Sequence, residues 1–600
     1  MCHFNKTKKN TVMKSIIKKI ILVLVIPILF TACDDDFLDR TPENSITEPE
    51  FFQTEGDLQV YTDGLHSNIG TSYNDLGSDN ISHHNSGSQM DQLLRGDVNE
   101  DNIGGWSWSN LRKINYFLVR YERAGVSDEI KNHYGGIAHY FRALEYFNKI
   151  KSYGEVPIYT TDLATNDDEL LYKAKDSRAD VFAFIMEDLQ FAIDNIRESS
   201  SKTRISKMSA LALASRIALH EGTYRKYHTE LGLSDGDLFL QKSADASTAI
   251  IASGKYSIYN TGSPSTDFTN MFSNLDLSSN PEIILYQDFD KTLTRFHNSA
   301  TVMDYEYALS RSLVDTYLKT DGTPFTSESG NETKTFDVVF ENRDPRMSQT
   351  AMPPGFKRGS STNEYVLKAS LGGYVQIKFF PTNEDGITWA GSYNDLPVFR
   401  YAEILLNYAE AKAELGTLTQ GDLDMSVNLL RDRAGMPHLV LADAIANVDP
   451  VLANRYHNVG GDGAILEVRR ERRVELACEG RRQDDLSRWK LGKILENSEQ
   501  GIYIPEFGAY DVTGDGIPDI AILSSPTETG PIDGLPNVDQ LAKYFISDNV
   551  FYLEDGSEGR IMFVSDRDRP KTFTEPKYYY IPIPRTEILL NPNLTQSEGW

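Results

Sequence analysis

The feature that most constrains the fold of this 600-residue chain is a pair of apolar stripes at helical spacing, joined by a short polar link. Ser177 is a natural N-cap with Asp180 three residues on, and the first stripe runs from there to Ile196. The second stripe is expected over 207–221, where four alanines allow another helix to approach closely and Gly222 is expected to end the helix. Together the two stripes predict a helical hairpin.

Helical patterns of the same kind are found elsewhere in the chain. They precede this pair at 111–123 and 129–151, and they recur near 245–253, at 396–415 with 424–434, and at 464–478 with 484–495. Repeated hairpins with small residues at the helix contacts are typical of a tetratricopeptide-like stack, although the spacing here is irregular. We therefore expect a mainly α fold.

The sequence between the predicted hairpins has a less regular pattern of apolar residues. Residues 256–396 contain short apolar runs, with strands expected at 282–286 and 374–380, and predict an irregular insertion that packs against the stack. Residues 72–105 are rich in Asn, Asp, Ser and Gly and predict a long exposed loop. The expected division is N-terminal hairpins over 33–255, the insertion over 256–396, and C-terminal hairpins with a mixed final segment over 397–600.

The N-terminus has the pattern of an export signal. Residues 1–32 hold six Lys, no acidic residue and an apolar run shorter than the roughly 20 residues of a membrane span. Translation starts at Met1 or at Met13. Cys33 follows small residues at the boundary and is predicted to be the lipidated first residue of the mature chain. Ordinary cleavage next to an incidental cysteine is the alternative.

Composition limits the classes of partner. The chain has 87 acidic and 60 basic residues, a net charge of −27, which repels phosphate backbones and anionic lipid surfaces. Nucleic acid is therefore not an expected partner, and lipid on Cys33 rather than a basic patch is expected to hold the protein at its membrane. Three cysteines provide no disulfide framework. An apolar content of 40% excludes a disordered chain.

Several short motifs occur in an order that resembles one known family. The motifs are Cys-Asp-Asp-Asp-Phe-Leu-Asp at 33–39, Arg-Ala-Leu-Glu-Tyr-Phe at 142–147, Asn-Arg-Asp-Pro-Arg at 342–346, Arg-Tyr-Ala-Glu at 400–403, Glu-Arg-Arg-Val-Glu-Leu at 471–476, Asp-Leu-Ser-Arg-Trp at 485–489 and Ile-Pro-Ile-Pro at 581–584. In this order they resemble the SusD/RagB family of outer-membrane nutrient-binding lipoproteins, and the resemblance extends over 33–600.

The resemblance implies a function and a cellular location. It implies a non-catalytic lipoprotein on the outer face of the outer membrane, which captures oligosaccharides and hands them to a SusC-like TonB-dependent transporter with no required cofactor. The acidic residues at 34–36 resemble the tag that directs lipoproteins to that face. RagB-like relatives imply peptide capture as an alternative. A surface glycoside hydrolase is a further alternative, because its two carboxylates need only be close in space.

Other enzyme classes leave no signature in the sequence. It contains no His-Glu-x-x-His, Gly-x-Ser-x-Gly or Walker motif. Cys478 is expected at an apolar position of a helix, as a small buried hydrophobe rather than a nucleophile. The Glu and Arg residues that alternate over 467–473 predict ion pairs on and between helices rather than a phosphate site.

One loop resembles the first part of a calcium site. Asp511, Thr513, Asp515 and Asp519 take positions 1, 3, 5 and 9, with Gly at position 6, and calcium prefers such oxygen ligands. Position 12 is Ile522, so the bidentate Glu of an EF-hand is missing. A structural calcium ion and a plain polar turn are both consistent with this pattern.

Sugar recognition uses flat aromatic faces together with planar polar side chains. Trp106 at the end of the 72–105 segment and Trp389 between two glycines fit that chemistry. Tyr73 and Tyr393 lie in Gly- and Asn-rich parts of the sequence and also fit it. These four residues are the predicted ligand contacts. Trp108 and Trp489 are expected to be structural.

Overall fold

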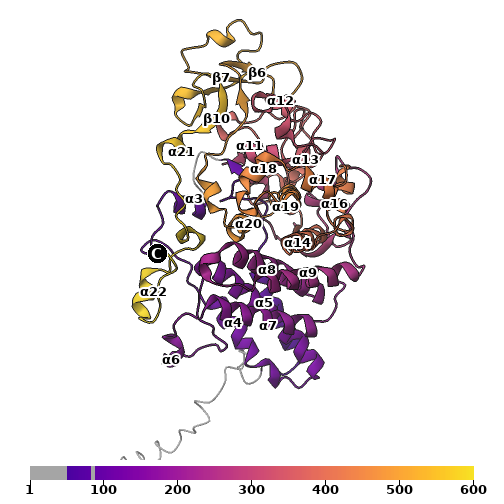
Figure 1. Cartoon of the computed structure of the whole chain (residues 1–600), viewed down its shortest axis with the longest axis vertical. Coiled ribbons are helices and arrows are strands. Elements are labelled where there is room, and N and C mark those ends of the chain that lie inside the picture. Colours follow the sequence, from indigo (N-terminus) through magenta and orange to yellow (C-terminus); the bar gives the residue numbers. More distant parts are fainter. Residues whose placement is uncertain (1–50, 83–87, 304) are drawn as a thin grey trace, which may run out of the picture.

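The computed structural model describes residues 51–82, 88–303 and 305–600 (Figure 1). Cys33 and the predicted export signal lie outside these residues. Within the described part of the chain, no helix combines the length and the apolar character needed to cross a membrane. Short strands accompany a fold that is mainly α-helical, as the sequence predicts.

Helices in the lower part and at the centre of the molecule in Figure 1 form the expected tetratricopeptide-like stack. They pack side by side in the order α4, α5, α7, α8, α9, α14 and α19. Their bounds are α4 Ser109–Leu118, α5 Asp128–Tyr153, α7 Arg178–Asn195, α8 Lys207–Tyr227, α9 Gly236–Ala252, α14 Tyr401–Glu414 and α19 Gly463–Glu475, with α2 (Glu55–Leu65) also against α5. The Ser177 hydroxyl accepts the backbone N–H of Asp180, which confirms the predicted cap of α7.

The prediction that Gly222 ends its helix is wrong, because α8 continues to Tyr227. A Cβ on Gly222 would lie 2.8 Å from the backbone nitrogen of Leu240 in α9. The glycine therefore serves a close helix contact, and the tertiary packing outweighs its low helix propensity. This contact lets α8 and α9 pack backbone to backbone.

Three other local expectations are also wrong. The 72–105 segment is not one long exposed loop, since its described part carries the buried residues Asp75 and Asp79, the strand β1 (Ile81–Ser82) and the helix α3 (Gln89–Leu94), and only residues 96–105 form a largely exposed loop. Residues 374–380 form a single β-bridge at Gln376 and a turn at 378–379 rather than a strand. Cys478 lies beyond the end of α19, in a left-handed conformation with φ of 66°, although it is buried as expected.

Strands are short and tie distant segments together. β2 (Ile283–Gln287) pairs with β4 (Leu396–Arg400) and so joins the two ends of the insertion at the stack. The other pairings are β1 with β3 (Ala308–Leu309), the sheet β5 (Tyr503–Ile504), β10 (Gly559–Phe563) and β9 (Phe551–Leu553), and the sheet β6 (Gly508–Tyr510), β7 (Ile520–Leu523) and β8 (Ala542–Phe545).

A buried ion network attaches the insertion to the stack. The Glu475 carboxylate in α19 accepts hydrogen bonds from Arg346, Arg400 and Arg433 at 2.9, 2.7 and 2.5 Å. The pKa of Glu475 is held well below its usual value by these arginines against its burial. The structural interpretation of the 467–473 run is thereby confirmed, since Arg470 pairs with Glu467 and Glu471 with Arg346.

Glu499 is a buried carboxyl group whose pKa is raised to about 7, by its burial first and by the negative charge of Asp79. As pH rises from the usual value of about 4.5 toward 7, the unfolded chain loses this proton while the folded chain keeps it, so folded-state stability falls.

We therefore expect Glu499→Gln to be more stable than the wild type, with an advantage that grows by about 1 kcal/mol between pH 6 and pH 8. Thermal unfolding of both proteins across this range measures it, with exposed Glu198→Gln as the control. An advantage that does not change with pH would contradict the assignment.

Candidate functional site

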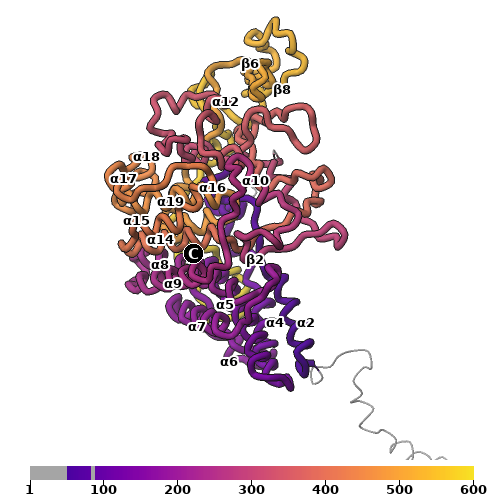
Figure 2. Tube along the Cα trace, turned by 90° about the vertical axis from the view of Figure 1, so that its right-hand side faces the viewer, coloured from indigo at the N-terminus to yellow at the C-terminus, as the bar shows by residue number. Residues whose placement is uncertain are grey.

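Exposed aromatic side chains gather on two loops of the insertion. The loop after β2 carries Phe296 and Tyr305, and the loop before β4 carries Trp389 and Tyr393. We call these four residues the insertion patch. The exposed fractions are 66% for Trp389, 50% for Tyr305 and 39% for Phe296, which is unusual for rings of this size. The insertion loops project to the right in Figure 2.

Rings of the insertion patch form two pairs. The centroids of Tyr305 and Trp389 lie 5.1 Å apart with planes inclined by 56°, and those of Phe296 and Tyr393 lie 6.4 Å apart at 75°. The rings of each pair are inclined rather than stacked, and the exposed rings present aromatic surface to the solvent. Such a surface fits the apolar face of a sugar ring, whose C–H groups contact the π-face.

Backbone hydrogen bonds hold the two loops together. The N–H of His297 donates to the carbonyl of Ser392 at 2.9 Å, and the N–H of Ser392 donates back at 3.2 Å. The N–H of Ala390 donates to the Asn298 side chain at 2.8 Å, while Ala390 itself has φ of 49°. Because these bonds fix the loops before any ligand arrives, less conformational entropy is lost on binding.

Polar groups around the insertion patch are paired. The Asp385 carboxylate accepts the hydroxyl of Tyr393 and the amide of Asn383, both at 2.8 Å, and forms an ion pair with Lys291. These hydrogen bonds hold the pKa of Asp385 far below its usual value. Asp288 pairs with Arg295 at 3.3 Å. Lys291 and Arg295, the basic residues described on these two loops, are therefore both paired with acidic side chains.

Two of the four predicted ligand residues belong to the insertion patch, and a third lies beside one of its two loops. Tyr73 is half-buried behind the insertion patch, with its ring 5.8 Å from that of His297, so it supports the loop on which Phe296 lies. Trp389 and Tyr393 are members of the patch. Phe296 and Tyr305 were not predicted, because their sequence surroundings do not distinguish an exposed ring from a buried one.

Trp106 lies in a different place. Its ring packs edge-on against Tyr153 and Trp108, at 4.7 and 5.3 Å. It lines a cavity of about 580 Å³ between α4 and the C-terminal helix α22 (Arg585–Leu590). Sequence reasoning grouped Trp106 with Trp389 as ligand residues, and the structure separates them. Trp108 also lines this cavity and is partly buried beside Lys149, whereas Trp489 is fully buried, as expected for a structural residue.

Asp395 and Glu499 are buried carboxyl groups with raised pKa values, a property of many catalytic acids. Asp395, at a pKa of about 7, is 1% exposed and accepts the backbone N–H groups of Leu277 and Phe289, both at 2.9 Å. Glu499 is also buried and lies against Asp79 and Arg455. Both carboxyl groups are thus buried and engaged by groups of the protein itself.

The predicted calcium loop forms the turn between β6 and β7. Asp511 accepts the N–H groups of Thr513, Gly514 and Gly516, and Asp519 accepts those of Val512 and Thr513. Ile522 is buried in β7 and supplies no ligand. Among the described residues, no three His, Cys, Asp or Glu side chains are grouped to hold a metal. Calcium binding at Asp511, Thr513, Asp515 and Asp519 stays a prediction. The hydrogen bonds of Asp511 and Asp519 form this turn without a bound ion.

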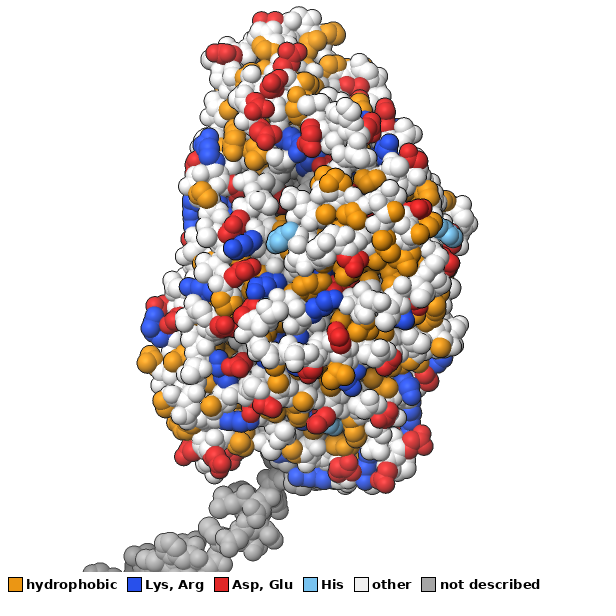
Figure 3. All heavy atoms as spheres, in the orientation of Figure 1, with side chains coloured by type: hydrophobic (Ala, Val, Ile, Leu, Met, Phe, Trp, Pro, Cys, Tyr) orange, Lys and Arg blue, Asp and Glu red, His pale blue; other side chains and the backbone are white. Residues whose placement is uncertain are grey.

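A second apolar surface differs in chemistry from the insertion patch. Figure 3 shows apolar side chains gathered over α16 (Val427–Ala434), α17 (Leu441–Ala446) and α18 (Pro450–Arg455). The exposed members near these helices are Met425, Val440, Ile445 and Val451. They lack the flat rings that sugar recognition uses.

Comparison with known families decides which family this chain belongs to. Residues 298–600 match the profile described as "SusD family", which is half of the chain. The chain belongs to the SusD family. Residues 36–219 of this SusD-family protein match a second profile, described as "Starch-binding associating with outer membrane".

Curated relatives and solved structures agree with this membership. SusD-like protein P38 of Formosa agariphila is 24% identical over 78% of this chain and 90% of its own length. A SusD-like protein of Bacteroides ovatus is 26% identical, but the match spans only 37% of this chain and 42% of the relative. A SusD-like carbohydrate-binding protein of Bacteroides fragilis has the same fold, with a TM-score of 0.65 at 21% identity over 91% of this chain and all of that one.

Proposed function

We propose that this SusD-family protein is a non-catalytic surface lipoprotein that captures a neutral oligosaccharide at the insertion patch and passes it to a SusC-like TonB-dependent transporter. The observation that carries the proposal is the exposed Tyr305–Trp389 pair on loops that hydrogen bonds hold in place. Rings of this kind lose little conformational entropy on binding and bury apolar area against a sugar face.

Charge supports a neutral ligand. The two loops that carry the insertion patch hold Asp288, Asp290, Glu384 and Asp385, which outnumber Lys291 and Arg295 on the same loops. The whole chain is also acidic. An acidic glycan would meet repulsion in such a field. The family relationship adds support, since one neighbour of the same fold is described as laminarin-binding, at a TM-score of 0.55 and 15% identity.

Calorimetric titration of the mature protein against plant, host and microbial glycans and against peptides tests the proposal. A binding protein must release its cargo, so we expect micromolar affinity, or about −8 kcal/mol. Chromatography of the mixture after titration should show the glycan intact. Cleavage of the glycan would place the chain among glycoside hydrolases, and binding of peptides alone would favour a RagB-like role.

Attachment to the outer membrane is proposed to depend on lipid at Cys33, with the protein facing the outside. Replacing Cys33 by Ala should move the protein from the membrane fraction to the soluble fraction, because the acyl chains supply the membrane affinity. Immunoblotting of the two fractions measures this shift, with wild type as the control. A Cys33→Ala protein that stays with the membrane would contradict the anchor.

The proposed complex with a transporter can be tested separately, by co-purification. Affinity purification of the wild-type protein from solubilised membranes should recover a TonB-dependent transporter in near-equal amounts. A tether at the same surface raises the effective concentration of the bound cargo over the pore, which is the physical advantage of such a pairing. A protein that is always recovered alone would count against the partnership.

A further inference from the structure

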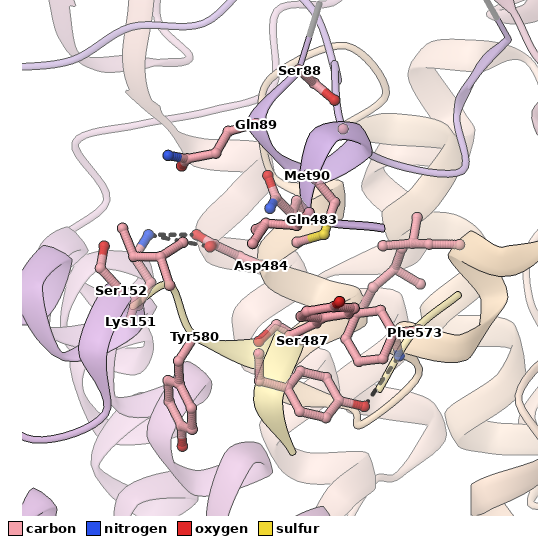
Figure 4. Close-up of a pocket in the computed structure, with 18 of the residues that line it drawn as sticks. Ser88, Gln89, Met90, Lys151, Ser152, Gln483, Asp484, Ser487, Phe573 and Tyr580 are labelled. Atoms are coloured by element: carbon pink, nitrogen blue, oxygen red, sulfur yellow. Dashed lines mark hydrogen bonds and ion pairs between the residues drawn. The ribbon is translucent and has the colours of Figure 1, made fainter. Parts of the chain in front are cut away.

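A cavity of about 270 Å³ lies where segments far apart in the sequence meet. Figure 4 shows α3 on one side, the end of α5 with Lys151 and Ser152 on another, and Phe573 and Tyr580 of the C-terminal segment closing it. The helix α20 (Arg482–Arg488) contributes Gln483, Asp484 and Ser487. None of the residues that line this cavity belongs to the insertion patch.

Two buried side chains that line the cavity have polar atoms without partners. His220 is 4% exposed, and its Nδ1 has no hydrogen bond to any described residue. Arg178 is 5% exposed; its Nε and Nη2 donate to Glu221, while its Nη1 has no described partner. Buried polar atoms nearly always have a partner, so these two atoms are available to a molecule that enters the cavity.

The ring of His220 is fixed by its neighbours. It stacks on Tyr224 with planes 13° apart and meets the edge of Phe147. Burial lowers the pKa of His220 well below its usual value, so the imidazole is neutral. A neutral imidazole offers one donor and one acceptor, which suits a hydroxyl group.

The walls and the opening of the cavity carry side chains of the types that bind sugars. The walls include the rings of Phe573, Tyr578, Tyr579 and Tyr580. Gln89 and Gln483 are exposed at the opening, and their amides make no hydrogen bond to a described residue. Planar amides beside aromatic rings are the groups that bind vicinal hydroxyls while the rings cover the C–H face.

The two basic side chains that line the cavity are each paired with a carboxylate. Lys151 pairs with Asp484 at 2.9 Å, and Arg178 pairs with Glu221 at 2.6 Å. A charged ligand would have to break one of these pairs. The volume is far above the roughly 30 Å³ of a water molecule and just below the roughly 300 Å³ at which pockets for drug-sized ligands begin. The ligand is therefore small and neutral.

We propose that this cavity is a second binding site, which holds one neutral monosaccharide with its hydroxyls on His220, Arg178, Gln89 and Gln483. The site is separate from the insertion patch, which takes an oligosaccharide on an open surface. A monosaccharide has few atoms, so we expect a dissociation constant of about 1–10 mM.

Saturation-transfer NMR of the mature protein with free glucose, galactose, mannose and xylose tests the proposal. At least one of these sugars should give a saturable signal. Gln483→Trp and, separately, Gln89→Trp should remove that signal, because an indole at either exposed position fills the opening while the core stays intact. Circular dichroism and the thermal midpoint serve as controls for folding.

Trp389→Ala separates this site from the insertion patch. The monosaccharide signal should be unchanged in Trp389→Ala, although oligosaccharide binding is expected to fall. The proposal is overturned if none of the four sugars binds, or if the signal survives in both tryptophan variants of the opening. A signal lost in Trp389→Ala and kept in Gln483→Trp would also overturn it and would assign the monosaccharide to the patch.

Discussion

Trp389→Ala is expected to weaken oligosaccharide binding by about 10–100-fold, because a central aromatic contact of this kind contributes about 1.5–3 kcal/mol. Trp389 is 66% exposed, so its loss removes contact area for the ligand but little from the protein core. The thermal midpoint should therefore stay close to that of the wild type. Calorimetric titration with the best glycan of the panel measures the change.

Tyr305→Ala combined with Trp389→Ala should abolish measurable binding, since both rings of the inclined pair are then gone. Trp106→Ala is the matched comparison, because it removes the same type of ring from the α4 cavity. We expect unchanged affinity in Trp106→Ala. If Trp106→Ala weakens binding and Trp389→Ala does not, the oligosaccharide site lies at the α4 cavity and the insertion patch is the wrong assignment.

Glu475→Ala is expected to destabilise the fold by about 3–5 kcal/mol, which is the cost of leaving buried charges without their partner. Glu475 is fully buried and accepts hydrogen bonds from Arg346, Arg400 and Arg433. Its removal leaves these three guanidinium groups sharing fewer carboxylates. Denaturant unfolding at neutral pH measures the loss.

Glu198→Ala is the matched control for this prediction. Glu198 pairs with Lys255 at 2.8 Å on the surface, where both side chains are nearly half exposed, so its removal should cost less than about 1 kcal/mol. Equal losses in the two variants would show that the buried network contributes no more than a surface pair. Glu475→Gln, which keeps the shape and one acceptor, should fall between them.

The pKa of Glu475 lies below its usual value, so its contribution to stability is present above about pH 4.5 and is lost as pH falls further. Glu499 acts in the opposite direction, with its pKa raised to about 7. The two carboxylates therefore favour stability at different ends of the acidic range. Burial raises the pKa of both, but three arginines outweigh it at Glu475, whereas at Glu499 Arg455 does not outweigh burial and the charge of Asp79.

Helices were predictable from the sequence where local signals agreed. The Ser177 cap and the stripe after it gave α7 within one residue, and alternating Glu and Arg residues indicated the ion pairs of α19. Prediction failed where a long-range contact reversed a local signal. Gly222 has low helix propensity, yet α8 continues through it because α9 packs against its bare backbone.

The 72–82 segment shows the same limit. Its Asn, Asp, Ser and Gly content is that of a surface loop, but Asp79 is fully buried because Arg473 and Arg482 neutralise it. Partners about 400 residues away in the chain cannot be read from local composition. The insertion patch has the same origin, since Tyr305 and Trp389 meet only after β2 and β4 pair.

The sequence by itself determined the helical stack, the family motifs, the acidic charge and the residue types suited to sugars, because each depends on neighbours within a few turns of the chain. Only the tertiary structure decided which aromatic rings lie together, which carboxylates are buried beside arginine, and where cavities remain. These depend on distances between segments that are remote in sequence, and on burial, which sets the strength of every charge and hydrogen bond.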